Sequence, residues 1–301
     1  MNTEQPPYEY FRKLFGHAGV VPFLGAGASF PDRQSEELDP LANLPTGKQL
    51  ANRLAECIRL PGEEVNINNL IEVASYYALW AGRHYLEKEL EEVFDSKQRP
   101  GSIHHFLAEV SAPLIITTNY DTLIEQAFRE RGRNFHMVMT PIYRHYDYKR
   151  RLLWWAPDVV QPVIQEIKEF SPIPKDLPVI YKIHGGFDPT GKWQSSVITE
   201  DDYFEIGGRI YEASLLPPYI QLMLADSHLL FLGYSLRDIH VRHMISDFRR
   251  QFNKQRDFLI TKSVSNLDRE RFRLLGLDIY ELTVAAFTEG LRQSIPNPDA
   301  T

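Results

Sequence analysis

Residues 19–29 read GVVPFLGAGAS, an apolar run that leads directly into small residues. A short run that is apolar at consecutive positions predicts a strand buried on both faces, as in a parallel sheet. The strand exit carries small residues that let the backbone approach a diphosphate and whose amides can hold its charge, namely Gly25, Ala26, Gly27 and Ser29. The same pattern also suits a tight turn, so this stretch alone leaves both interpretations open.

Five more apolar runs with sharp ends predict strands at residues 114–118, 179–184, 228–232, 257–261 and 277–282. Helical spacing occurs at residues 46–60, 67–79, 84–94, 121–131, 209–225, 241–252 and 267–275. Strands that alternate with helices predict an α/β fold with a doubly wound, mainly parallel, Rossmann-like sheet.

The chain is expected to form a single domain over residues 1–301. About 90 residues with helical spacing separate the first two strands, although a regular mononucleotide-binding unit returns to the sheet after one helix. We therefore predict a helical insertion after the first strand, at about residues 40–110. The stretch from about 140 to 178 is rich in Tyr, Trp, Arg and Pro, and it predicts a loop-rich excursion over the sheet.

Composition narrows the classes of function. A net charge of −7 gives no electrostatic case for binding nucleic acid or an anionic membrane. The single cysteine, Cys57, excludes an intrachain disulfide and a multi-cysteine zinc site, and it fits a reducing compartment. We expect a cytoplasmic protein, because the N-terminus lacks the pattern of a signal peptide and no apolar run approaches the length of a membrane span.

Three later strands also end in polar or glycine-rich motifs: TTNYD at 117–121, HGG at 184–186 and GYSLRD at 233–238. Ligands of open α/β sheets bind beyond the carboxyl ends of the strands, so these motifs and the glycine loop share one edge. Each motif has an ordinary alternative as a helix cap, a turn or a structural histidine. Their combination predicts a nucleotide site with Asn119 and His184 at its centre.

Other nucleotide chemistries fit the sequence less well. Phe30 stands where the third glycine of the dehydrogenase fingerprint belongs, which disfavours hydride transfer. Residues 42–49, ANLPTGKQ, lack the upstream glycine and the Ser or Thr of a phosphate loop, so we reject nucleoside triphosphate hydrolysis. His240 and His243 favour an exposed helix face over a metal pair, because no further ligand is evident, and we predict no metal site.

The four motifs resemble, in order, those of the sirtuin superfamily. GAGAS matches the sirtuin glycine loop, TTNYD matches Thr-Gln-Asn-Ile-Asp, HG matches the catalytic histidine, and GYSL resembles the later Gly-Thr-Ser-Leu loop. Residues 197–205, VITEDDYFE, look like a segment typical of bacterial sirtuin-like defence proteins. The resemblance implies that Asn119 and His184 are catalytic and that NAD is bound by Gly25, Ala26, Gly27, Ser29, Thr118, Asp121, Gly233 and Ser235.

Two departures from deacylase sirtuins change what the resemblance implies. The four zinc-binding cysteines after the histidine are missing, and Pro-Asp-Phe-Arg is echoed only by Pro31-Asp32-Arg33. The chain resembles instead the sirtuin-like NAD hydrolases of antiphage systems, which deplete NAD in infected cells. This implies NAD as substrate, no zinc and a homo-oligomer. Some of these hydrolases work beside a HerA-type translocase ATPase, and others beside an Argonaute-like protein or within longer fused chains. Because the chain is almost wholly sirtuin-like, it suits a two-component system, for which a HerA-type ATPase is one candidate partner.

Cleavage of the nicotinamide–ribose bond demands little acid catalysis, because the cationic pyridinium departs neutral and leaves an oxocarbenium-like ribose. Asn119 suits a role in holding the ribose and a water molecule, and His184 suits that of a base. Asp121 could hold either the loop or the ribose hydroxyls. Two alternatives stay open: a non-catalytic module that binds NAD or ADP-ribose and regulates a partner, and, more weakly, an NAD-dependent protein deacylase.

Overall fold

The structure is a computed structural model that describes residues 5–30, 44–58, 65–94, 98–110, 112–141, 150–211, 216–236, 238, 241–246 and 256–294. The sequence interpretations of Pro31-Asp32-Arg33 and of His240 lie outside these ranges.

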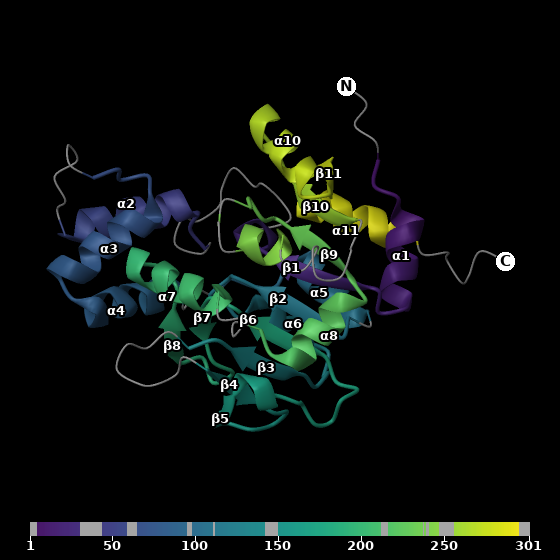
Figure 1. The fold of residues 1–301 in the computed structure, drawn as a ribbon, viewed down its shortest axis with the longest axis horizontal. Coiled ribbons are helices and arrows are strands. Elements are labelled where there is room, and N and C mark those ends of the chain that lie inside the picture. Colours follow the sequence, from purple (N-terminus) through teal and green to yellow (C-terminus); the bar gives the residue numbers. More distant parts are fainter. Residues whose placement is uncertain are drawn as a thin grey trace.

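A nine-stranded sheet forms the centre of the fold, in the order β11-β10-β9-β1-β2-β6-β3-β4-β5 (Figure 1). All neighbours from β11 to β3 pair in parallel, whereas β4 and β5 pair antiparallel. The predicted doubly wound, mainly parallel α/β fold is therefore confirmed. The strands are β1 Val20–Leu24, β2 Leu114–Thr117, β3 His136–Met139, β4 Arg151–Trp155, β5 Val163–Glu166, β6 Val179–Lys182, β9 His228–Leu232, β10 Asp257–Thr261 and β11 Leu277–Glu281.

Consecutive apolar residues in the central strands point into two different cores. Val21 and Phe23 of β1 pack into the core on one face of the sheet, and Val20 and Leu24 pack into the core on the other. Helices α7 Glu200–Tyr211, α8 Pro218–Ala225 and α10 Asn266–Leu274 contribute to the first core. Helices α1 Tyr8–Gly16, α5 Ser102–Glu109, α6 Leu123–Glu130 and α11 Val284–Gln293 contribute to the second.

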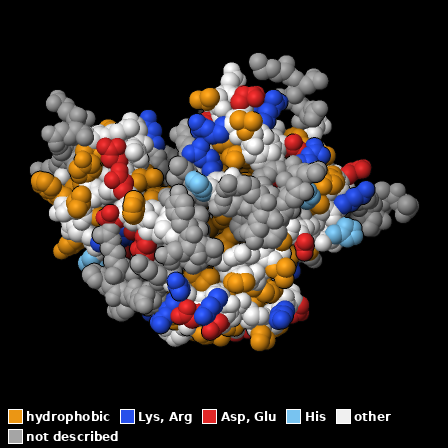
Figure 2. All heavy atoms as spheres, viewed as in Figure 1, with side chains coloured by type: hydrophobic (Ala, Val, Ile, Leu, Met, Phe, Trp, Pro, Cys, Tyr) orange, Lys and Arg blue, Asp and Glu red, His pale blue; other side chains and the backbone are white. Residues whose placement is uncertain are grey.

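Three helices between β1 and β2 form a unit with an apolar core of its own: α2 Gly47–Ile58, α3 Leu70–Trp80 and α4 Arg83–Phe94. We refer to them as the helical module, which lies beside the sheet at the left of Figure 1. Its core also takes in Tyr120 and Ile198 from the rest of the fold. Large apolar side chains remain exposed on its surface, and Figure 2 shows hydrophobic groups there; the exposed ones include Tyr76, Leu79, Trp80 and Tyr85.

One arginine ties the helical module to the sheet side of the molecule. Nη1 of Arg83 lies 2.6 Å from Oδ2 of Asp202, which caps the start of α7, and Nη2 donates to the carbonyl of Ser196 at 2.7 Å. Ser196 belongs to a two-stranded sheet of β7 Gly185–Phe187 and β8 Trp193–Ser196 that follows β6 directly. The module is thereby held next to the segment that follows β6.

Two segments with a specific sequence interpretation fold differently. The stretch at 140–178, for which a loop-rich excursion is predicted, contributes β4 and β5 to the end of the sheet. The single helix predicted at 209–225 is wrong, because α7 ends at Tyr211 and α8 begins at Pro218. Proline is tolerated in the first turn of a helix but breaks its interior, which explains why α8 begins where it does.

Candidate active site

A cavity of about 1000 Å³ lies at the carboxyl ends of the parallel strands, with one wall supplied by the helical module. The module contributes apolar side chains that include Leu50, Leu70 and Phe94. The volume is at the upper end of the range of small-molecule sites, which suits a ligand as large as a dinucleotide. The structure brings nine of the predicted site residues to this cavity: Ala26, Gly27, Ser29, Thr118, Asn119, Asp121, His184, Gly233 and Ser235.

The remaining predicted residue, Gly25, lies behind the cavity lining and shapes it through close backbone packing. A Cβ atom at Gly25 would lie 2.4 Å from Cδ2 of Tyr234 and 2.8 Å from the carbonyl oxygen of Gly233. The amide of Gly27 donates to the same Gly233 carbonyl at 2.8 Å. The exits of β1 and β9 therefore touch each other, and only glycine fits at these positions. We refer to residues 25–29 and 233–235 as the phosphate cradle, after the diphosphate-binding role that the sequence predicts for the glycine loop.

The side chain of Asn119 is held by two hydrogen bonds to the phosphate cradle. Its Nδ2 donates to the carbonyl of Gly25 at 2.9 Å and to Oγ of Ser29 at 2.9 Å. A carbonyl oxygen can only accept, so the contact with Gly25 fixes which end of the amide is Nδ2. The carbonyl end of the Asn119 side chain is therefore the one that can accept a hydrogen bond from a water molecule or a ribose hydroxyl.

Asp121, which also lines the cavity, completes this network. The hydroxyl of Ser29 donates to Oδ2 of Asp121 at 2.7 Å, and the amide of Leu123 donates to Oδ1 at 3.0 Å. The same carboxylate thus caps the start of α6 and orients the serine that holds Asn119. Of the two roles left open by the sequence, these contacts support holding the loop.

His184 faces a carboxylate from the end of another strand. Its Nε2 lies 3.3 Å from Oδ2 of Asp238, and both side chains are largely buried, with relative exposures of 6% and 9%. The ring of Tyr203 meets the imidazole edge-on, with ring centroids 5.7 Å apart. A buried carboxylate at this distance stabilises a histidine that takes up a proton, so the pair can act as a base.

Two tyrosines line the cavity near this pair as neutral phenols. Burial raises the pKa of Tyr203 and of Tyr234 well above the usual value of 10.0. Both lie among the cavity-lining residues with Asp238, whose charge also raises their pKa values. Their hydroxyls therefore offer hydrogen bonds without adding negative charge near an anionic ligand.

Four contributions to the cavity are absent from the predicted site: Asp238, Tyr203, the apolar wall, and the residues at the ends of β10 and β11. Asp238 stands in the quoted motif GYSLRD and Tyr203 in VITEDDYFE, and both line the cavity. The motifs could therefore have pointed to both residues, although neither was assigned a role from the sequence. The apolar wall of the helical module has no such motif. The carboxyl ends of β10 and β11 contribute Thr261, Lys262 and Thr283, at the far end of the cavity from β6.

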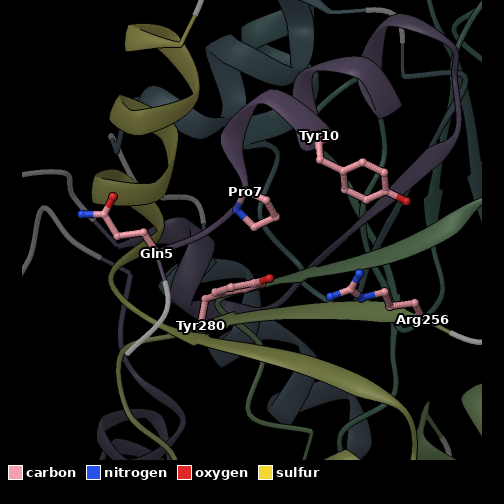
Figure 3. Close-up of a pocket in the computed structure, with 5 residues that line it drawn as sticks. All are labelled: Gln5, Pro7, Tyr10, Arg256 and Tyr280. Atoms are coloured by element: carbon pink, nitrogen blue, oxygen red, sulfur yellow. The ribbon is translucent and has the colours of Figure 1, made fainter. Parts of the chain in front are cut away.

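A smaller pocket of about 450 Å³ lies near the amino-terminal ends of β9 and β10, lined by the five residues shown in Figure 3. Tyr10 contacts His228 of β9 there at 3.3 Å, and Arg256 is paired with Asp278. None of the predicted site residues lies in this pocket. The larger cavity is therefore the candidate active site.

The described residues also bear on other classes of site. No group of three or more His, Cys, Asp or Glu side chains in these ranges is arranged to hold a metal ion. Within the same ranges, no helix combines the length and apolar character needed to cross a bilayer.

Comparison with known proteins bears on the same region of the chain. A model of the SIR2-like domain matches residues 113–280, which include β2, β6 and β9 with their motifs. The chain is 27% identical over 201 residues to "NAD(+) hydrolase ThsA" of Enterococcus faecium, covering 64% of this chain and 36% of that protein. It is 25% identical over 244 residues to the protein of the same name from Cytobacillus dafuensis, covering 79% and 40%.

A third relative has a different name. "Defense-associated sirtuin 2" of Bacillus subtilis is 23% identical over 258 residues, which cover 83% of this chain and 21% of that protein. The chain thus spans less than half the length of each of these three curated relatives.

Proposed function

The chain belongs to the family of SIR2-like domains, and from that premise we propose that it hydrolyses NAD to nicotinamide and ADP-ribose. The observation that carries the proposal is the meeting of three features in one cavity: the phosphate cradle, the oriented amide of Asn119 and the His184–Asp238 pair. Relatives named as NAD hydrolases support the choice of substrate.

The proposed reaction follows from the chemistry of the leaving group. Nicotinamide departs as a neutral base, so the catalytic demand is to stabilise the positive ribose and to deliver water to its C1′ atom. Asn119 is bound to the phosphate cradle through Nδ2, and its carbonyl oxygen is suited to orient that water or a ribose hydroxyl. His184 accepts the proton released, and the Asp238 carboxylate stabilises the resulting imidazolium.

The two ends of the substrate are proposed to occupy different parts of the cavity. The phosphate cradle, at the exits of β1 and β9, is suited to the diphosphate because its glycines let a ligand approach the backbone. The nicotinamide ribose then lies toward β2 and β6, which carry Asn119 and His184. Adenosine lies toward the ends of β10 and β11, in line with the strand order of the sheet.

The direct test mixes the purified protein with NAD and follows nicotinamide release with and without an acyl-lysine peptide. Release that does not depend on the peptide supports hydrolysis, and loss of that release in Asn119→Ala and His184→Ala supports the site. A matched control is His105→Ala, which removes a partly exposed histidine on α5 outside the cavity lining. Undiminished turnover in purified His184→Ala would contradict the catalytic assignment.

One observation favours a second candidate, a module that binds NAD or ADP-ribose and regulates a partner. The side chain of His184 is largely covered, by Asp238 and Tyr203 among others, and a covered base suits binding without turnover. Saturable NAD binding without nicotinamide release would support this candidate. Protein deacylation is the weaker alternative, and release that requires the acyl-lysine peptide would favour it.

The biological setting is also part of the proposal. By its resemblance to antiphage NAD hydrolases, and by its similarity to a protein named as a defence-associated sirtuin, the chain is proposed to deplete cytoplasmic NAD during infection. The resemblance also suggests a homo-oligomer that works beside a HerA-type translocase ATPase. Mass measurement of the purified protein, alone and after co-expression with such an ATPase, tests both statements.

A further inference from the structure

Two opposite charges are completely buried beneath the candidate active site. Lys182, the last residue of β6, and Glu125, on α6, each have a relative exposure of 0%, and Nζ lies 2.9 Å from Oε1. Charges out of water are costly and are retained only where hydrogen bonds and an opposite charge compensate them.

The ammonium group of Lys182 has two further acceptors, both on the loop that carries Asn119. It donates to the backbone carbonyl of Asp121 and, at 3.4 Å, to that of Tyr120. Together with Glu125 these carbonyls give the three donors of the ammonium group three acceptors. The buried lysine therefore binds the two residues that directly follow Asn119.

Lys182 also stands two positions before His184 on the same strand exit. Its side chain packs beneath Gly186, where a Cβ atom would lie 3.0 Å from Cε of Lys182 and 2.6 Å from the carbonyl oxygen of Tyr120. Gly186 also adopts a φ of +130°, a conformation that side chains rarely permit. Both observations require a glycine at the point where the two loops meet. One ammonium group thus links the strand that presents His184 to the loop that presents Asn119.

We propose that Lys182 is a positioning residue for NAD cleavage, which sets the separation of Asn119 and His184 and is held in place by Glu125. The inference rests on the proposed function. Stability alone is a weak reason for such a pair, because apolar residues of similar volume often replace a buried ion pair without loss of stability. What apolar side chains cannot replace is the set of hydrogen bonds to the carbonyls of Tyr120 and Asp121.

The test replaces both charges in the variant Glu125→Leu/Lys182→Met. The variant should remain folded, with some stability lost because the carbonyls of Tyr120 and Asp121 lose a donor. Its kcat for nicotinamide release should fall at least about tenfold, since small misplacements of catalytic groups are costly. The KM for NAD should stay within about threefold of the wild-type value, because the phosphate cradle is unchanged. A merely structural pair would change stability and leave the kcat of the folded protein unaltered.

The matched control is Phe128→Leu, a buried residue on the same helix as Glu125 whose side chain packs into the second core. It should lower the melting temperature and keep kcat. If Glu125→Leu/Lys182→Met does not fold, the apolar pair Glu125→Met/Lys182→Leu replaces it, with the same loss of kcat expected.

The outcomes separate this inference from the proposed function. A wild-type protein that releases no nicotinamide overturns the proposed function and this inference with it. A wild-type protein that turns over, beside a folded double variant of unchanged kcat, overturns the positioning role alone. A tenfold loss of kcat in a folded double variant supports both.

Discussion

Oδ1 of Asp238 accepts the amide hydrogen of Val241 at 3.3 Å, while Oδ2 of the same carboxylate faces Nε2 of His184 at the same distance. The carboxylate is therefore fixed at the start of a helix and aimed at the imidazole. This arrangement makes Asp238 a partner of the proposed base.

Replacing Asp238 with asparagine keeps the size of the side chain and removes its charge. We expect kcat for nicotinamide release to fall by about 10²-fold or more, because a protonated His184 loses its counter-ion. KM for NAD should change little. Asp278→Asn is the matched control, because Asp278 pairs with Arg256 outside the active-site cavity. Equal losses in the two variants would contradict the assigned role.

Ser29 links Asn119 to Asp121, so Ser29→Ala tests the network rather than the amide itself. The variant loses two hydrogen bonds, and we expect the free energy of unfolding to fall by about 1 kcal/mol. Its kcat should fall about tenfold, because the side-chain amide of Asn119 loses its contact with Ser29 and keeps the one with Gly25. Ser265→Ala removes the N-cap of α10 at a similar cost in stability and should leave kcat unaltered. Denaturant unfolding and nicotinamide release measure the two effects.

Gly25→Ala places a methyl group against Gly233 and Tyr234. Because the neighbouring atoms are backbone and a buried ring, we expect a loss of about 1–3 kcal/mol in stability and a raised Kd for NAD. Gly208→Ala is the control, since nothing lies within 4 Å of its added Cβ atom. Alanine should stabilise α7 there by about 0.5–1 kcal/mol. Unchanged NAD affinity in Gly25→Ala would contradict the role of Gly25 in NAD binding.

His136 gives the stability a predictable dependence on pH. Its Nε2 donates to the carbonyl of Pro174 at 2.8 Å and its Nδ1 accepts from Nε1 of Trp154 at 3.3 Å, which together require the neutral ring. Burial lowers the pKa of His136 below its usual value of 6.5. The unfolded chain therefore binds this proton at higher pH than the folded chain does. The stability that the neutral ring contributes is complete above about pH 6.5 and is lost as pH falls through the folded pKa.

The corresponding experiment compares melting temperatures at about pH 7 and about pH 5 in the wild type and in His136→Gln. The wild type should lose more stability on acidification than the variant, because glutamine does not titrate. Equal losses would show that other groups govern the acid limb of the stability curve.

The central strands could be predicted closely because they are apolar throughout. Parallel strands buried on both faces have no polar side to interrupt the pattern, and the predicted limits of β9 and β10 coincide with the observed ones. β3 escaped prediction since His136 interrupts a short run. The partners that satisfy this buried histidine, Pro174 and Trp154, are distant in sequence.

The candidate site could be predicted only where a motif directly follows a strand. Asn119 and His184 meet this condition, and the sheet order then brings their strands together. Asp238 and Tyr203 belong to the site because they contact His184. These contacts join residues that are distant in sequence, so local spacing does not reveal them. The apolar wall of the cavity is still harder to predict from sequence, because it depends on how the helical module, which has its own core, packs against the sheet.

That attachment is narrow. Among the described residues, the helical module has an apolar core of its own and meets the rest of the fold at Tyr120 and Ile198, through the hydrogen bond between Ser75 and Glu200, and through the contacts of Arg83 with Asp202 and Ser196. The module as a whole could therefore be replaced by the corresponding module of a relative. In a chimaera that carries the module of a relative, the wall in contact with substrate changes while the phosphate cradle and the Asn119–His184 pair stay native. Ligand selectivity in such recombinants is then expected to follow the donor of the module, and the chemistry to follow the recipient.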